Sequence, residues 1–249
     1  MDIMSYNIFK GGEGRMDKIA RVVKTYSPAI LAIQEANTWL NEDKTTAKQF
    51  GQNTGMNHFA IATGGEQDCH AATFSRQPFK STQVLKPFCN ACLQVVTSGT
   101  LGEIAVFNVH LSPLSEDDRI KEIDQVINAS KKFLNSVIIG DFDSLSVNDS
   151  YDIKLFNDQQ LVKFTKEGVI RHEVVGSLLA AGFIDCGADT NIPTVPTKFN
   201  QDPAPAVPLR LDYAFVSAGL KNKIKSCQVI KTNETNSASN HYPILLTLN

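Results

Sequence analysis

The sequence lacks the long apolar runs and the charge imbalance that mark several classes of protein. No run of about 18 apolar residues occurs, so we expect no membrane-spanning helix. Lysine and arginine number 24 against 26 aspartate and glutamate residues, which gives a net charge of −2. A protein that coats nucleic acid by charge alone carries a basic face, and this balance does not predict one.

The beginning of the chain, MDIMSYNIF, has no basic stretch followed by an apolar segment. Such a stretch is the mark of a secretory signal peptide. We therefore expect a cytoplasmic protein, with a removed signal peptide as the alternative.

Cysteine is scarce as well. Five cysteines in 249 residues are an odd number in a chain that is not small, which argues against a disulfide scaffold. Cys89 and Cys92 form one C-x-x-C pair, but a structural zinc site needs four ligands and no second pair follows. We interpret the cysteines as ordinary thiols, with a redox or metal role for this pair as the alternative.

Short apolar, strand-like segments fill much of the chain, with a few helix-like segments between them. Helices are predicted at 16–26, from Ser115 onward and at 171–181, and a long loop at 189–208. Many short strands with few helices favour two packed sheets with helices outside, in one domain over 1–249. The predicted strands are 3–9, 29–35, 58–62, 71–75, 92–98, 103–112, 136–142, 209–217, 224–231 and 242–249.

Polar side chains stand where several predicted strands begin or end. Taken singly, each is typical of a turn, a cap or a hydrogen-bonded structural residue. If the strand ends converge, however, so many carboxylates need a cation beside them. Oxygen ligands favour Mg²⁺ or Mn²⁺ over zinc. The residues are Asn7, Glu35, His110, Asp141, Asp143, Asp212, Asn240 and His241.

The order and surroundings of these residues resemble the endonuclease/exonuclease/phosphatase superfamily. Its members include pancreatic deoxyribonuclease, exonuclease III-type repair nucleases, sphingomyelinases, inositol-phosphate 5-phosphatases and deadenylases. The resemblance implies a DNase I-like α/β fold, a four-layer sandwich of two mixed sheets flanked by helices. The matching segments are SYNI (5–8), IQE (33–35), VHLSP (109–113), GDFD (140–143), RLDYAFVS (210–217) and SNHYPI (239–244).

The resemblance also implies roles for the polar residues. Glu35 is expected to be the main metal ligand. Asn7 is expected beside it, at both the metal and the substrate, and Asp141 is expected to orient or deprotonate the attacking water. His110 is expected to contact the scissile phosphate. Asp212 is expected to hold His241, which contacts the phosphate or transfers a proton. Water attacks directly, so no serine or cysteine nucleophile is needed.

Two positions depart from the family pattern. The family usually has asparagine at position 143 and aspartate at position 240, whereas this chain has Asp143 and Asn240. An ionised Asp143 cannot donate a hydrogen bond to a phosphate. We therefore hypothesise that Asp143, besides lying at the substrate, takes over metal binding that Asn240 has given up. The expected ligands are Glu35, Asn7, Asp143 and Asn240, and eroded activity is the alternative.

The expected function is hydrolysis of a phosphodiester in nucleic acid or a nucleotide, with Mg²⁺ or Mn²⁺ as cofactor. Lipid head groups or sugar phosphates are alternative substrates, and a catalytically weakened binding module is a third possibility. We expect a monomer whose partner is the phosphate-ester substrate. Basic residues in or near loops could meet that phosphate, although most are interpreted as solvated: Lys80, Lys86, Lys163, Lys166, Arg171 and Lys198.

Overall fold

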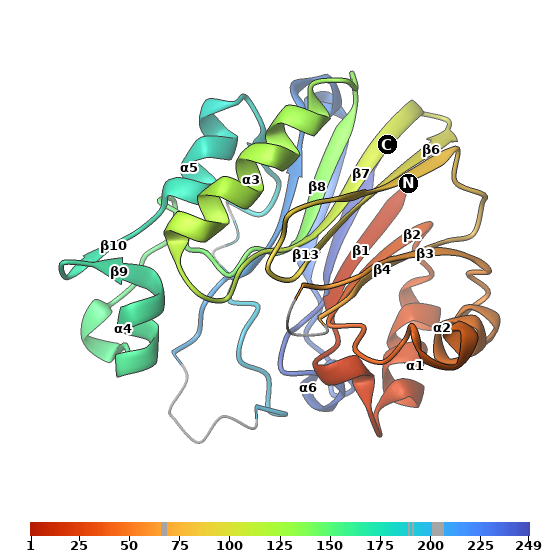
Figure 1. Ribbon diagram of the computed structural model, residues 1–249, viewed down its shortest axis with the longest axis horizontal. Coiled ribbons are helices and arrows are strands. Elements are labelled where there is room, and N and C mark those ends of the chain that lie inside the picture. The colour runs from red at the N-terminus through yellow and green to blue at the C-terminus, as the bar shows by residue number, and fades with distance from the viewer. Residues whose placement is uncertain (66–68, 189, 191, 201–206) are drawn as a thin grey trace.

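Two six-stranded sheets form the centre of the protein in the computed structural model, which describes residues 1–65, 69–188, 190, 192–200 and 207–249 (Figure 1). The helices are α1 (Met16–Tyr26), α2 (Asn41–Thr54), α3 (Glu116–Ser130), α4 (Asp158–Phe164), α5 (Glu173–Ala180) and α6 (Thr235–Ala238). The strands are β1 (Asp2–Asn7), β2 (Ile30–Gln34), β3 (His58–Ala62), β4 (Ala71–Ser75), β5 (Ser81–Leu85), β6 (Ala91–Gly99), β7 (Gly102–His110), β8 (Ser136–Asp141), β9 (Thr165–Lys166), β10 (Val169–Ile170), β11 (Ile184–Asp185), β12 (Asp212–Val216), β13 (Ile224–Val229) and β14 (Ile244–Leu248).

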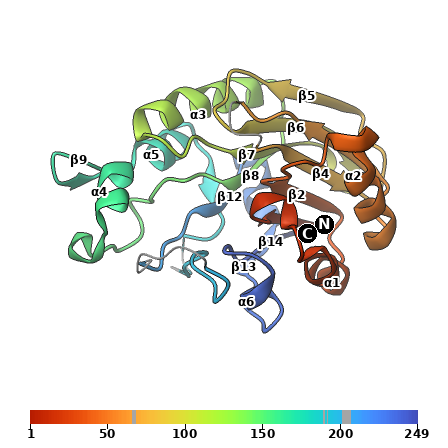
Figure 2. The ribbon, with the colours of Figure 1, turned by 60° about the horizontal axis from the view of Figure 1, so that its bottom comes forward.

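Each sheet is mixed. The first sheet has the strand order β13-β14-β1-β2-β4-β3, and the second has β11-β12-β8-β7-β6-β5. β1 and β2 are parallel, as are β7 and β8, while the other pairs are antiparallel. Among the described residues a separate two-stranded hairpin, β9–β10, follows α4 and projects with it at one side of the sandwich (Figures 1 and 2).

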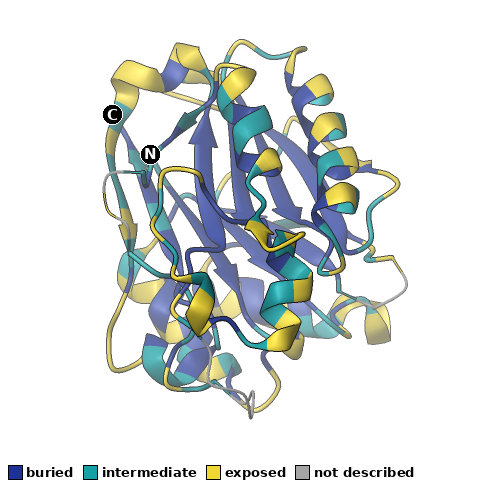
Figure 3. Ribbon diagram, turned by 90° about the vertical axis from the view of Figure 1, so that its left-hand side faces the viewer, coloured by how far each residue is buried: buried dark blue, intermediate teal, exposed yellow. Residues whose placement is uncertain are grey.

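The apolar side chains divide into layers that explain the packing. Residues such as Ile3 and Val106 lie between the two sheets. The outer face of the first sheet packs against α1 and α2, and that of the second against α3 and α5. Figure 3 shows the consequence: the strands in the middle of the sandwich are buried, whereas the helices keep an exposed face. The predicted four-layer α/β sandwich is therefore confirmed.

Several elements differ from the sequence prediction. α2 was not predicted because few of its residues are apolar, and only Ala47, Phe50, Gly51 and Thr54 are buried. β5 was missed because four of its five residues are exposed, so no apolar alternation marks it. The strand predicted at 209–217 begins only at Asp212. Part of the loop predicted at 189–208 lies outside the described residues, namely 189, 191 and 201–206.

The helices also bear on the question of a membrane span. Within the described ranges, no helix combines the length and the apolar character that crossing a membrane requires. This agrees with the sequence, which contains no sufficiently long apolar run.

Candidate functional site

Strand direction brings the predicted site residues to one edge of the sandwich. β1 and β2 run parallel and end at Asn7 and Gln34, just before Glu35. β7 and β8 also run parallel, and β12 begins beside the end of β8 because it is antiparallel to it. The register places His110 opposite Asp141 and Asp141 opposite Asp212, so that these three residues form one row across three strands.

A cavity of about 400 Å³ opens at this edge. Asn7 and Asp212 do not line it but lie buried behind Asp141 and His241, to which they are hydrogen-bonded. The cavity is lined by Lys10, Glu35, Asn37, Cys69, Asn90, His110, Pro113, Asp141, Asp143, Lys163 and His241.

Asp141 is the centre of the hydrogen-bond arrangement. Asn7 Nδ2 donates to its Oδ2 at 2.9 Å, and the backbone N–H of Asp143 donates to its Oδ1 at 3.0 Å. The Nε2 atoms of His110 and His241 each lie 3.7 Å from the same Oδ2. Burial raises the pKa of Asp141, the charge of Asp143 raises it further and the histidines lower it, so that the pKa comes to about 6. Its carboxylate is thus a stronger base than that of an exposed aspartate.

His241 is held by a buried carboxylate. Its Nδ1 lies 2.9 Å from Asp212 Oδ2. Burial lowers the pKa of His241, but the charges of Asp212 and Asp141 outweigh burial and raise the pKa to about 10. A protonated ring has N–H donors at both nitrogens. His241 can therefore keep its bond to Asp212 and offer Nε2–H to a ligand.

Glu35 adopts an unusual backbone conformation, with φ at 55°. Positive φ is uncommon outside glycine, and such residues cluster at functional sites. Two hydrogen bonds hold Glu35 in place: the Lys10 backbone N–H donates to Oε2 at 2.8 Å, and the Gly11 N–H donates to the Glu35 carbonyl at 2.8 Å. The carboxylate is thus fixed at the cavity wall before any ligand binds.

The donor set fits a divalent cation. Two groups of three ligand atoms lie within 4.8 Å of one another in the described part of the chain: His110 with Asp141 and Asp143, and Asp141 with Asp212 and His241. Glu35 lines the same cavity. His110 Nδ1 is buried without a hydrogen-bond partner among the described residues. Several carboxylates in one cavity are the ligands that hard divalent ions prefer.

Comparison with known proteins agrees with this arrangement. The model of the endonuclease/exonuclease/phosphatase family matches residues 4–230. The chain belongs to this family. The family description names endonucleases, exonucleases and phosphatases, all of which hydrolyse phosphate esters. A comparison with curated proteins gave no match.

Solved structures of family members share the fold. An AP endonuclease from Archaeoglobus fulgidus superimposes with a TM-score of 0.76 at 15% identity, covering 100% of this chain and 99% of the other. A 3′-5′ exonuclease, NExo, from Neisseria meningitidis gives 0.74 at 18% identity and covers 100% of both chains. A family protein from Beutenbergia cavernae gives 0.73 at 15% identity, over 100% of this chain and 72% of the other. Identities this low establish the fold alone.

The two departures from the family pattern lie in different surroundings. Asp143 belongs to the candidate metal group with His110 and Asp141, and Lys163 Nζ donates to its Oδ1 at 2.5 Å. Asn240 lines a second cavity, of about 250 Å³, and its Oδ1 accepts from Ser239 Oγ at 3.3 Å. The hypothesis that Asp143 binds the metal in place of the residue at position 240 stays a prediction.

A polar contact between the sheets was missed by the sequence analysis. Gln34 Nε2 donates to Asn108 Oδ1 at 2.7 Å, and Ser5 Oγ lies within hydrogen-bond distance of the same amide. Asn108 Nδ2 in turn donates to the carbonyls of Ile33 and Ala72. The signal was present, because Gln34 and Asn108 are amides within otherwise apolar strands. They join the strands that carry Glu35 and His110.

Two further positioning residues come from outside the strand ends. Thr194 Oγ1 accepts from the backbone N–H groups of Leu211 and Asp212, at 3.0 and 3.2 Å. Ser239 Oγ donates to the Asn7 carbonyl at 2.7 Å. No sequence pattern identified Thr194, because it lies in the segment predicted only as a long loop.

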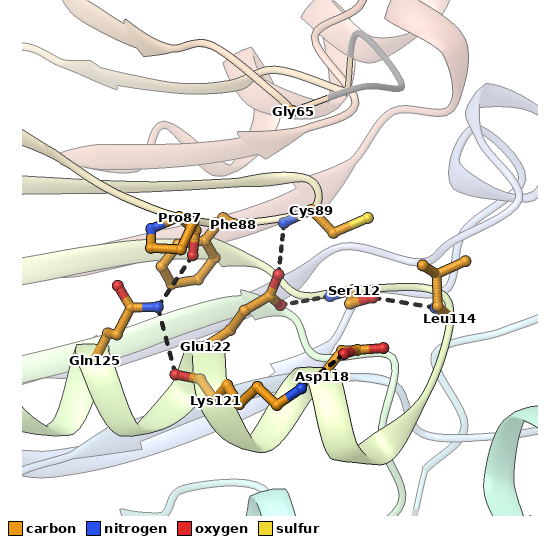
Figure 4. A pocket seen from close by; sticks show the side chains of 10 residues that line it. All are labelled: Gly65, Pro87, Phe88, Cys89, Ser112, Leu114, Asp118, Lys121, Glu122 and Gln125. Atoms are coloured by element: carbon orange, nitrogen blue, oxygen red, sulfur yellow. Dashed lines mark hydrogen bonds and ion pairs between the residues drawn. The ribbon is translucent and has the colours of Figure 1, made fainter.

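Glu122 fixes the segments that flank His110. Figure 4 shows its carboxylate in a neighbouring cavity of about 420 Å³, between the backbone nitrogens of Cys89 and Ser112. These nitrogens donate to Glu122 at 2.6 and 2.7 Å. Burial raises the pKa of Glu122.

The second cysteine of the C-x-x-C pair, Cys92, is fully buried in the apolar layer under α3. Such burial is typical of an ordinary thiol.

Proposed function

We propose that this family member is a divalent-metal-dependent phosphoesterase that hydrolyses a phosphodiester by direct attack of water. The observation that carries the proposal is the meeting of Glu35, Asp141 and His241 at one cavity, although they come from three separate parts of the chain. A carboxylate at a metal, a second carboxylate as base and a held histidine are the groups that such a reaction requires.

Each residue has a role that its surroundings favour. Glu35 would hold Mg²⁺ or Mn²⁺, which neutralises phosphate oxygens and stabilises the charge of the transition state, while Asn7 orients Asp141 from behind the cavity. Asp141, whose pKa is raised to about 6, accepts a proton from the attacking water or orients it. His241, held through Nδ1 by Asp212, donates from Nε2 to the phosphate. His110, whose Nε2 also lies 3.7 Å from Asp141 Oδ2, donates a second hydrogen bond to the phosphate.

Nucleic acid or a nucleotide is the substrate class we propose. Two observations on similar structures support it: one is an AP endonuclease, and a NExo variant is described as a 3′ phosphatase bound to a product DNA hairpin. The chain itself carries a near-zero net charge. Affinity would therefore depend on the cavity and the metal more than on an extended basic surface.

The proposal is tested with bis-p-nitrophenyl phosphate and p-nitrophenyl phosphate in Mg²⁺, Mn²⁺ or EDTA. We expect hydrolysis with metal, a loss of at least about 100-fold in EDTA, and a preference for the diester. A panel of plasmid, single-stranded DNA, RNA and phosphoinositides then identifies the substrate class. A chain inert toward all of these esters with both metals would contradict the proposal.

Exchanging the two unusual residues tests their place in metal binding. We expect Asp143→Asn to weaken Mg²⁺ binding about tenfold, because a charged oxygen ligand becomes a neutral one. Adding Asn240→Asp to that variant is expected to restore part of the affinity. Isothermal titration with Mg²⁺ measures both, with Asp124→Asn on the exposed face of α3 as the matched control. Unchanged affinity in Asp143→Asn would rule out Asp143 as a ligand.

A further inference from the structure

One basic residue reaches the site from outside the sandwich. Lys163, near the end of α4, places Nζ 2.5 Å from Asp143 Oδ1. The side chains are 26% and 8% exposed, so the contact is largely removed from solvent. Of the six basic residues that the sequence suggested could meet phosphate, Lys163 is the one that lines the cavity.

Lys163 is held in position by buried groups. Arg119 Nη2 donates to the Lys163 carbonyl at 2.8 Å, and Arg119 Nε donates to Glu116 Oε2 at 2.9 Å. The Arg119 side chain is 0% exposed. At the other end of α4, Asn157 and Gln160 form a reciprocal capping box. The backbone that carries Lys163 is therefore held at both ends of the helix, and its ammonium is held by Asp143.

The ion pair stands at the junction of two cavities. Asp143, Lys163 and His241 line both the cavity that contains Glu35 and the second cavity beside Asn240. The pair thus lies where a ligand extending from one cavity into the other must pass. Lys10, the other lysine that lines the Glu35 cavity, is an exposed residue.

The charges around Asp143 explain why a lysine is useful there. Asp143 lies beside Asp141, and an uncompensated carboxylate would repel a phosphate. With Lys163 the pair has no net charge. An ammonium has three N–H donors, and Asp143 Oδ1 takes one of them. Lys163 can therefore keep its carboxylate partner while donating to an anion in the cavity.

We propose that Lys163 is a phosphate-binding residue: it cancels the charge of Asp143 and donates a second hydrogen bond to a phosphate oxygen of the ligand. The inference rests on the proposed function, because it assumes that the cavity binds a phosphate group. It assigns α4, which lies outside the two sheets, a part in substrate binding.

The experiment is a double-mutant cycle in which the binding of inorganic phosphate is measured. Lys163→Met, Asp143→Asn and the double variant are titrated with phosphate by calorimetry, once in EDTA and once in Mg²⁺. We expect Lys163→Met to weaken binding about tenfold, because a donor is lost and Asp143 is left unpaired. In EDTA the double variant is expected to bind phosphate more tightly than Lys163→Met and less tightly than the wild type, because the unpaired charge is gone while the donor is still absent. Lys163→Arg is expected to retain most of the affinity.

Controls separate a binding role from a structural one. Lys166→Met removes an exposed lysine three residues away and is expected to leave phosphate binding unchanged. Circular dichroism and thermal unfolding of each variant report the fold. Lys163→Met binding phosphate like the wild type, a double variant as weak as Lys163→Met, or a wild type that binds no phosphate in either condition would each overturn the inference.

The inference and the proposed function fail in different ways. If the wild type hydrolyses esters and Lys163→Met keeps the wild-type KM and phosphate affinity, Lys163 has no role in binding and the proposed function stands. If the wild type is inert toward every ester but binds phosphate through Lys163, the proposed function is wrong and the inference about Lys163 stands.

Discussion

Replacement of Asp141 by asparagine is expected to lower ester hydrolysis by about 10³-fold, because the variant has no carboxylate to act on the attacking water. The side chain keeps its size and one oxygen, so Asp143 N–H retains an acceptor. Oδ2 receives Asn7 Nδ2 and faces both histidines, so one substitution also alters the contacts of three other site residues.

Initial rates with bis-p-nitrophenyl phosphate at saturating metal measure this effect, and thermal unfolding shows whether the fold is retained. Asp124→Asn, which removes an exposed carboxylate from α3, is the matched control and should keep wild-type rates. A rate within about tenfold of the wild type for Asp141→Asn would contradict the role of Asp141 as the base.

Gly140→Ala is expected to destabilise the protein by about 3 kcal/mol or more. A Cβ added at Gly140 would lie 1.9 Å from the Val109 carbonyl oxygen, a backbone atom that no side-chain rotation can move. Gly140 also has φ at 151°, which L residues rarely adopt. Because Gly140 directly precedes Asp141 and pairs with Val109, any accommodation would displace the row that contains His110 and Asp141.

Urea unfolding followed by circular dichroism measures the loss of stability. Gly99→Ala is the matched control, because nothing lies within 4 Å of a Cβ added there. Its free energy of unfolding should stay within about 0.5 kcal/mol of the wild type. Equal stability of the two variants would show that β7 and β8 can separate without cost.

The sequence was most informative at the strand ends. Apolar runs located β1, β2, β7 and β8, and each run was followed by a polar residue with no evident structural use. Strand direction then brings Asn7 and Glu35 together in the first sheet, and His110 and Asp141 together in the second, because parallel neighbours end at the same edge of a sheet. The motifs that carried the family resemblance are these same strand ends, so the fold and the site were predicted by one set of residues.

Residues outside regular strands escaped prediction for physical reasons. α4 has seven residues and buries only Phe164, so no apolar periodicity marks it. Lys163 was one of several lysines in or near loops, and its contacts with Asp143 and Arg119, which distinguish it, are made between segments far apart in the sequence. Thr194 acts through a hydroxyl that meets the start of β12 from a distant segment. Contacts of this kind depend on tertiary packing, which leaves no local periodicity.

The amide contact between Gln34 and Asn108 has a mechanical consequence. Glu35 and Asp141 belong to opposite sheets, so their separation would change if thermal motion let the sheets slide past each other. Apolar packing alone resists such sliding weakly, since one methyl contact can replace another. The buried hydrogen bonds from Gln34 and Asn108 have no such substitutes. Transplanting this site onto another sandwich would therefore require that amide pair as well as the acidic residues.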